Sequence, residues 1–188
     1  MQQEENLVRL ARQGEPGGFE QLYESYFDRI YRYIVMKVRN RADAEDLTQQ
    51  VFMKAYESID AFRWRGVPFA AWLFRIAHNQ VVDHFRKRNR ENTLPLDEAM
   101  TQSGPDFDPV AIAERRMQVK QLIDASGQLT EAQREVIALR FAGGLSVAET
   151  ARAMGKSEGA TKVLQHDALA KLRRIISFKQ EEASGRAV

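Results

Sequence analysis

The stretch SVAETARAMGKSEGATKVLQHDALAKLRR, residues 146–174, has the pattern of two helices joined at Gly155. Ser146 and Glu149 have capping-box spacing at the start of the first helix, and glycine is the preferred residue where a helix ends in a left-handed turn. Such a pair fits either a hairpin that contacts DNA bases or an amphipathic hairpin that closes a small helical domain. Spacing alone leaves both alternatives open.

Helical periodicity also dominates the chain before this hairpin. Apolar and aromatic residues recur at helical intervals over 19–38, and a second helix is expected to begin after Asn40. A third is expected from Pro68, because proline suits the first turn of a helix. The segment 108–126 is expected to form a further helix.

The next helix should follow Thr130, which has capping-box spacing with Gln133, and Gly143-Gly144 is a plausible stop for it. The sequence has no convincing strand pattern. We therefore predict an all-α fold.

Charge and proline content divide the chain. Residues 1–90 contain 15 basic and 12 acidic residues, 91–128 contain 3 and 7, and 129–188 contain 10 and 7. Residues 91–110 hold three of the five prolines and almost no helical periodicity. We expect two small helical domains, 1–90 and 111–178, with a flexible acidic linker over 91–110 and a flexible tail over 179–188.

Several classes of protein are disfavoured by composition. The chain has no cysteine, its three histidines are scattered, and it lacks a phosphate-binding loop and a serine-nucleophile motif. DAEDL (43–47) is better explained as an acidic helix start than as a catalytic cluster. We expect no catalytic residue, no metal and no cofactor, hence no enzyme. No long apolar run is present, so we expect a cytoplasmic chain without membrane insertion.

The third predicted helix carries a polar stripe beside a basic and aromatic loop. Arg75, Asn79 and Arg86 share one face of that helix, whereas Phe69, Leu73 and Ile76 share another. The preceding loop, DAFRWRGVP (60–68), alternates aromatic rings with arginines, which suits single-stranded nucleic acid because rings stack on bases and guanidinium groups contact phosphates. An ordinary core role for the aromatic rings is equally compatible with these residues.

The second predicted helix has an outward stripe that is acidic at one end. The stripe consists of Asp43, Asp46, Gln50, Met53 and Glu57. Leu47, Val51, Ala55 and Ile59 lie on the opposite, core side. Protein docking is one interpretation of the stripe, although the residues alone favour a plain solvent face.

These segments together resemble a known family. Three segments of the first half resemble region 2 of bacterial RNA polymerase sigma factors of the extracytoplasmic-function (ECF) group, in the sigma-70 family. They are FEQLYESYFDRIYRYI, DAEDLTQQVFMKAYESIDAFR and PFAAWLFRIAHNQVVDHFRKR. LTEAQREVIALRFAGGLSVAETARAMGKSEGATKVLQHDALAKLRR resembles their region 4. The resemblance covers nearly the whole chain in the family's order, which a lone helix-turn-helix would not do.

The resemblance implies a sigma factor that directs core RNA polymerase to promoters and helps to open them. The implied docking residues, on the clamp coiled coil of the β′ subunit, are Asp43, Asp46, Gln49, Gln50, Phe52 and Met53. The residues implied to recognise the minus-ten element, with a flipped base of its unpaired strand, are Phe62, Arg63, Trp64, Arg65, Arg75, Asn79 and Arg86. Further implied partners are the β flap and an anti-sigma factor, and the acidic linker would thread toward the RNA exit channel.

With the family in view, the hairpin is interpreted as DNA-binding. Ala151 is small enough for close helix packing, and a stripe formed by Thr161, Leu164, Ala168 and Leu172 is expected to be buried. The implied contacts with the minus-thirty-five duplex are Ser157, Glu158, Lys162, Gln165, His166 and Arg173.

The sequence departs from the family pattern at two positions. Thr161 replaces the usual apolar residue and can bond its hydroxyl to the preceding turn, whereas Asp167 replaces a usual basic residue and weakens a phosphate grip. Two other classes remain as alternatives: a stand-alone helix-turn-helix regulator, and a nucleic-acid-processing enzyme that uses DAEDL to hold metal.

Overall fold

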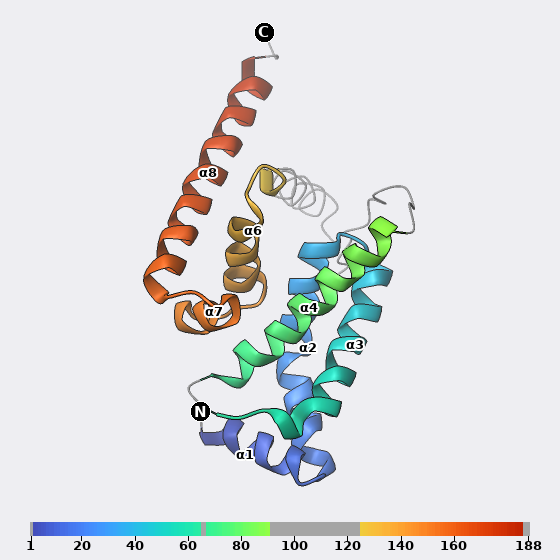
Figure 1. Ribbon diagram of the computed structural model, residues 1–188. Helices are drawn as coiled ribbons and strands as arrows, with labels where there is room; N and C mark the ends of the chain where they lie inside the picture. Colours follow the sequence, from blue (N-terminus) through green and yellow to red (C-terminus); the bar gives the residue numbers. More distant parts are fainter. Residues whose placement is uncertain (1, 65–66, 91–124, 186–188) are drawn as a thin grey trace, which may run out of the picture.

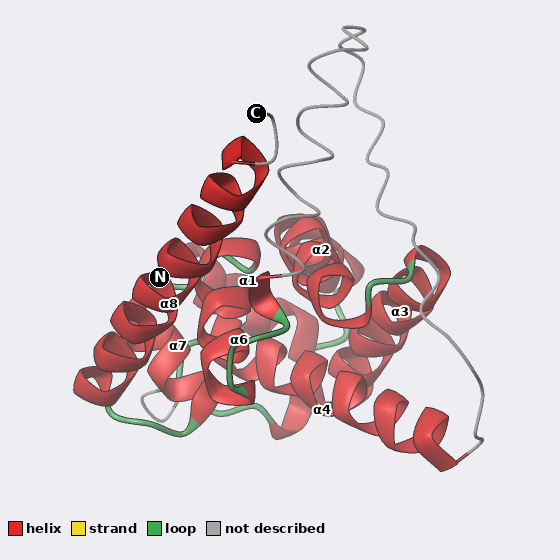
Figure 2. Cartoon of the chain, turned by 90° about the horizontal axis from the view of Figure 1, so that it is seen from above, coloured by secondary structure: helices red, strands yellow, loops and turns green. Residues whose placement is uncertain are grey.

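The computed structural model describes residues 2–64, 67–90 and 125–185, and every regular element within them is helical (Figures 1 and 2). This confirms the all-α prediction. The helices are α1 (Gln2–Arg12), α2 (Pro16–Val38), α3 (Arg41–Ser58), α4 (Phe69–Arg90), α6 (Glu131–Ile137), α7 (Val147–Met154) and α8 (Glu158–Gly185). Short turns η1 (Ile59–Ala61) and η2 (Ala138–Ala142) follow α3 and α6. The predicted linker, 91–110, and all but the end of the predicted 108–126 helix lie outside the described residues.

Helices α1 to α4 form the N-terminal unit around an apolar core. The side of α3 predicted to face the core does so, since Leu47, Val51, Ala55 and Ile59 are all buried. Helix α1 was not anticipated, because its charged residues obscure a short apolar face. Leu7, Val8 and Ala11 bury that face against the rest of the unit.

Local chemistry sets the ends of these helices as expected. Asn40 Oδ1 accepts the backbone N–H of Asp43 at 2.9 Å and caps α3. Capping boxes are present at Thr130, which starts α6, and at Ser146, which starts α7. Gly155 closes α7 with φ 64°, a conformation that glycine adopts without strain.

The C-terminal unit consists of α6, α7 and α8. The predicted inner stripe of α8 is confirmed, because Thr161, Ala168 and Leu172 are buried and Leu164 packs against the same core. The Thr161 hydroxyl donates to the Ser157 carbonyl at 2.9 Å, which accommodates the departure from the family pattern. Helix α8 continues through Gly185, beyond the predicted domain end at residue 178.

The two units lie against each other rather than apart. In Figure 1, α6 and α7 lie between α8 and the pair α2 and α4. Ala138, Leu139 and Leu145 belong to the same apolar cluster as the N-terminal core. Gly143 meets Phe74 so closely that an added Cβ would lie 2.6 Å from the ring. The sequence pattern predicts separate domains and contains no sign of this contact.

Candidate functional site

The outer face of α3 presents polar side chains and one large apolar side chain to solvent. Asp46, Gln49 and Gln50 are exposed, and the Met53 residue is 64% exposed. An exposed methionine beside polar groups is a common feature of surfaces that bind other proteins. Four of the six predicted docking residues are therefore accessible.

The other two predicted docking residues have different surroundings. The Asp43 carboxylate is partly covered, with Oδ2 at 3.5 Å from both His84 Nε2 and Arg88 Nη1 of α4. Phe52 is only 4% exposed, and its ring packs on that of Tyr23 with 4.6 Å between centroids. The expectation that Phe52 faces a partner is therefore corrected: its ring belongs to the core beneath the face.

A pocket of about 550 Å³, which is not among the sequence-based expectations, borders the α3 face. It is lined by Tyr23, Phe27, Asp28, Tyr31, Arg32, Arg41, Glu45 and Gln49. The signal was present in α2, where three aromatic residues recur every fourth position and so share one face. The pocket extends the exposed face of α3 onto α2.

The loop before α4 contains both core and surface aromatic residues. Phe62 is 2% exposed, and its ring centroid lies 5.1 to 5.6 Å from those of Trp64, Trp72 and Phe69. Its predicted contact with DNA is corrected to a core role. Trp64 is partly exposed, and its ring packs edge-on against that of Phe62.

Of the two arginines in this loop, the structure describes only Arg63. Arg63 is exposed and donates through Nη1 to the carbonyls of Asp60 and Phe62. These two hydrogen bonds fold its side chain back over the turn after α3. Arg65 lies outside the described residues.

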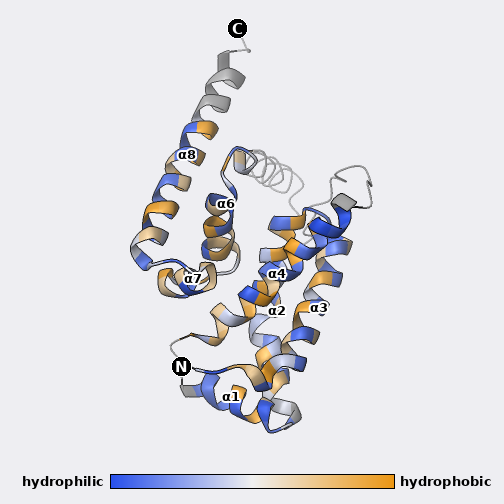
Figure 3. Cartoon of the chain, in the orientation of Figure 1, coloured by the Kyte–Doolittle hydropathy of each residue, from blue (hydrophilic) through white to orange (hydrophobic). Residues whose placement is uncertain are grey.

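The predicted polar stripe of α4 faces solvent. Arg75, Asn79 and Arg86 are all exposed, and Arg86 Nη1 lies 3.4 Å from Asp83 Oδ1. Figure 3 shows hydrophilic residues concentrated toward the C-terminal end of this helix. The stripe is thus an accessible surface of region 2 that carries two arginines.

The predicted duplex-contacting residues lie on α8 and just before its first residue. Ser157, Glu158, Lys162, His166 and Arg173 are exposed. Gln165 is partly covered and accepts a hydrogen bond from Arg140 Nε at 2.9 Å. Asp167 Oδ1 lies 3.4 Å from His166 Nδ1, so this carboxylate reduces the positive charge on the face.

Comparisons with known proteins identify the family. The Sigma-70 region 2 model matches residues 22–91, and the Sigma-70, region 4 model matches residues 127–174. SigX of Bacillus subtilis, an ECF RNA polymerase sigma factor, is 33% identical over 168 residues, covering 87% of this chain and 86% of SigX. The chain belongs to the ECF RNA polymerase sigma factors.

A second relative and two solved structures agree with this assignment. BldN of Streptomyces coelicolor is 41% identical over 170 residues, which cover 90% of this chain and 64% of BldN. The solved structure of CnrH in complex with the cytosolic domain of CnrY has a TM-score of 0.70 at 25% identity, covering 93% of this chain and 97% of CnrH. The solved structure of RpoE of Bartonella quintana in complex with the anti-sigma factor NepR has a TM-score of 0.67 at 25% identity. The match covers 85% of this chain and 96% of RpoE.

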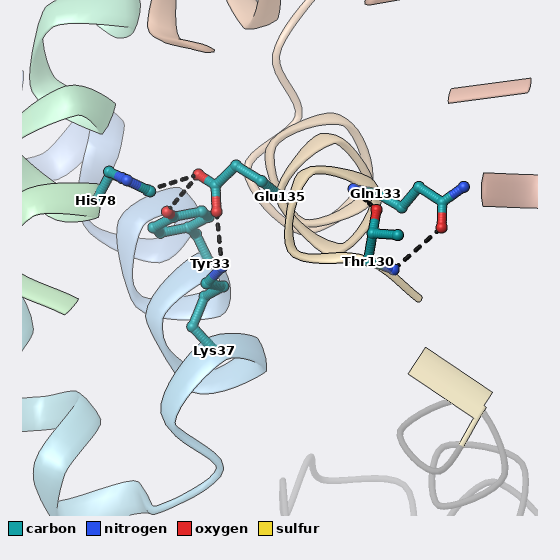
Figure 4. A network of polar contacts seen from close by, with 6 residues as sticks. All are labelled: Tyr33, Lys37, His78, Thr130, Gln133 and Glu135. Atoms are coloured by element: carbon teal, nitrogen blue, oxygen red, sulfur yellow. Dashed lines mark hydrogen bonds and ion pairs between the residues drawn. The ribbon is translucent and has the colours of Figure 1, made fainter. Parts of the chain in front are cut away.

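The contact between regions 2 and 4 of this sigma factor contains a buried carboxylate that is not among the sequence-based expectations. The Glu135 side chain in α6 is 8% exposed. It accepts hydrogen bonds from Tyr33 Oη and Lys37 Nζ, each at 2.7 Å, and lies 3.1 Å from His78 Nδ1 (Figure 4). In the sequence it is one of two glutamates on a short helix.

These partners change the proton affinities of the groups involved. Burial opposes ionisation of Glu135, but the hydrogen bond from His78 and the charge of Lys37 outweigh it and lower the pKa of Glu135 to about 2. The hydrogen bond to Glu135 raises the pKa of His78. Burial, followed by the Glu135 charge, raises the pKa of Tyr33 well above its ordinary value.

The described residues contain no group of three His, Cys, Asp or Glu side chains that could hold a metal ion. Among the same residues, no helix is both long and apolar enough to span a bilayer.

Proposed function

We propose that this chain acts as an alternative sigma factor: it binds core RNA polymerase and directs it to a particular set of promoters. The observation that carries the proposal is the match to regions 2 and 4 in one chain. The accessible α3 face on the first region and the exposed start of α8 on the second support it. In this role the chain works in the cytoplasm as a non-catalytic initiation factor.

The α3 face is the proposed contact with the polymerase. Asp46, Gln49, Gln50 and Met53 dock on the clamp coiled coil of the β′ subunit, with Asp43 at the edge of the contact. Phe52 supports that face from beneath through its ring contacts with α2. Region 4 makes the second contact, with the β flap.

Region 2 is also proposed to hold the opened minus-ten element. Trp64 offers a ring on which an unpaired base stacks, and Arg63 lies beside it. Arg75, Asn79 and Arg86 follow the single strand along α4. Base flipping costs a few kcal/mol, and these stacking and polar contacts offset that cost.

The start of α8 is proposed to bind the minus-thirty-five duplex. Its exposed early residues face base edges in the major groove, whereas Arg173, further along, contacts the phosphate backbone. An anti-sigma factor is a further proposed partner. The solved structure of RpoE supports it, because this similar sigma factor was solved in complex with the anti-sigma factor NepR.

Reconstitution with core RNA polymerase tests the function. Run-off transcription from genomic fragments should yield discrete promoter-specific products that core polymerase alone does not give. Changing Asp46→Lys and Gln50→Lys together should abolish co-purification with core. The same charge change on the exposed face of α2, Gln21→Lys with Glu24→Lys, serves as the control.

The outcomes separate the candidate functions. Unchanged core binding by the Asp46 and Gln50 double variant would show that the α3 face is misassigned. If the wild-type chain binds DNA but neither binds core nor supports initiation, a stand-alone regulator replaces the sigma-factor proposal.

A further inference from the structure

Every partner of the Glu135 carboxylate in the described part of the chain comes from the opposite region. Tyr33 and Lys37 belong to α2, and His78 belongs to α4. A buried carboxylate is stable only while donors and positive charge surround it. Its burial therefore depends on the contact between regions 2 and 4.

A second set of hydrogen bonds crosses the same contact, again with donors on α2 and acceptors in region 4. Arg29 Nε donates to the Gly143 carbonyl at 2.9 Å, and Arg32 Nε donates to the Ala142 carbonyl at 3.4 Å. These carbonyls lie at the end of η2, where a helix leaves acceptors unsatisfied. The Arg29 guanidinium also lies over the ring of Tyr26, 4.9 Å from its centroid. Side chains of α2 therefore complete a helix end of region 4.

This closed arrangement brings the two proposed DNA-binding helices close together. Helix α7 contacts both α4 and α8. Packed helices lie about 8–10 Å apart, so about 20 Å separates the axes of α4 and α8 across α7. The full length of α4 adds only about 33 Å at about 1.5 Å per residue.

A promoter requires a longer reach than this. The centres of the minus-ten and minus-thirty-five elements lie about 25 base pairs apart, or about 85 Å at about 3.4 Å per base pair. The distance between the α4 and α8 axes is shorter than the distance between the two promoter elements. It remains shorter when the full length of α4 is added to it. The closed arrangement therefore cannot contact both elements of one promoter at once.

We propose that Glu135, with Tyr33, Lys37 and His78, forms a latch that holds the sigma factor in a closed conformation unable to span a promoter. Release of the latch separates region 4 from region 2 and lets α8 reach the minus-thirty-five element. The identity of the released state rests on the proposed function. The role of Glu135 in holding the contact closed is independent of the proposed function.

The latch is sensitive to single substitutions. In the open form, water solvates the carboxylate and each of its partners. In the closed form, removal of one group leaves another buried without its partner, which disfavours that form. Glu135→Gln removes the charge and places an amide donor among donors, so it should favour opening. Glu131→Gln makes the same chemical change at an exposed position of the same helix.

Thiol labelling measures the opening directly, because the full-length chain contains no cysteine. Ala138→Cys places a thiol in the apolar cluster shared by the two regions, and Ala168→Cys places one in the separate core of region 4. At a constant pH, the labelling rate of a buried thiol by a maleimide is proportional to the fraction of time that it is exposed. Glu135→Gln should accelerate labelling at position 138 at least tenfold, while labelling at 168 stays unchanged. Glu131→Gln should change neither rate.

Two results would overturn the latch. The first is labelling at position 138 that stays at the wild-type rate in Glu135→Gln. The second is equal acceleration at both positions, which would mean that Glu135 stabilises region 4 itself.

A second variant keeps the test decisive if Glu135→Gln fails to fold. Tyr33→Phe removes one hydroxyl and keeps the ring. It should accelerate labelling at 138 about tenfold, as expected for one hydrogen bond to a charged group, and an unchanged rate refutes the proposal. No polymerase or promoter enters this assay, so its failure is distinct from failure of the proposed function.

Discussion

Acidification should weaken the contact between the two regions through Glu135. Its pKa falls from 4.5 to about 2 in the closed form. Each tenfold change in proton affinity corresponds to about 1.4 kcal/mol, so ionised Glu135 contributes about 3 kcal/mol at neutral pH. Because the pKa is lowered, this contribution is complete above pH 4.5 and is lost as the pH falls toward 2. About 1.4 kcal/mol of it should disappear between pH 6 and pH 3.5.

The contribution of His78 to the contact has the opposite dependence on pH. Its pKa is raised by the hydrogen bond to Glu135, so its contribution is complete below pH 6.5 and is lost as the pH rises through the raised value. Tyr33 and Lys37 of α2 and Glu131 of α6 are the other titratable groups that act on this pair. The contact should therefore be strongest between about pH 4.5 and 6.5.

Urea unfolding followed by tryptophan fluorescence measures the effect, since Trp64 and Trp72 both lie in region 2. Between pH 6 and pH 3.5, the wild-type chain should lose about 1.4 kcal/mol more of its free energy of unfolding than Glu135→Gln loses. His78→Gln should instead flatten the loss above pH 6.5. Equal acid losses in the wild type and Glu135→Gln would refute the reasoning, because the acid sensitivity would then come from other carboxylates.

Three further predictions concern the proposed DNA contacts and one helix cap. Trp64→Ala should leave core binding nearly unchanged but reduce promoter opening, measured by permanganate reactivity of thymines, since stacking contributes roughly 1–3 kcal/mol per base; undiminished reactivity would assign the ring to the core alone. Gln165→Ala should relax the base preference at one minus-thirty-five position by about 1–3 kcal/mol. Arg173→Ala should instead weaken binding to all DNA sequences alike and lower the slope of log affinity against log salt concentration by about one. Holoenzyme binding to single-base promoter variants at two salt concentrations separates these effects, and the reverse pattern would mean that another face of α8 contacts the bases. Asn40→Ala should lower the free energy of unfolding by about 1 kcal/mol while Asn40→Asp retains it, and equal losses in chemical denaturation would exclude the side-chain cap.

The helix ends and inner faces follow from the sequence because short-range chemistry determines them. Asn40 and Ser146 cap the helices that they precede, and Gly155 takes the left-handed turn that its lack of a side chain allows. The inner stripe of α8 follows from helical spacing, including Thr161, whose hydroxyl bonds within its own helix.

The contact between the regions does not follow from such patterns. Glu135 has the charge of a solvent-facing residue, and nothing within its own helix indicates that α2 and α4 cover it. Phe52 and Phe62 show a related ambiguity, because an aromatic ring suits both a core and a stacking surface. Their burial depends on neighbours from other parts of the chain.

The turn η2 constrains how the chain can vary in length. It is a π-helical turn, in which the Gly143 N–H donates to the Ala138 carbonyl five residues earlier at 2.9 Å. Such a turn contains one residue more than an ordinary helical turn. Deleting any one residue from Ala138–Ala142 would restore the usual helical register and rotate the downstream residues by about 100° around the axis. The carbonyls that Arg29 and Arg32 bind would then point elsewhere, so substitutions within this turn should be tolerated more readily than a single deletion.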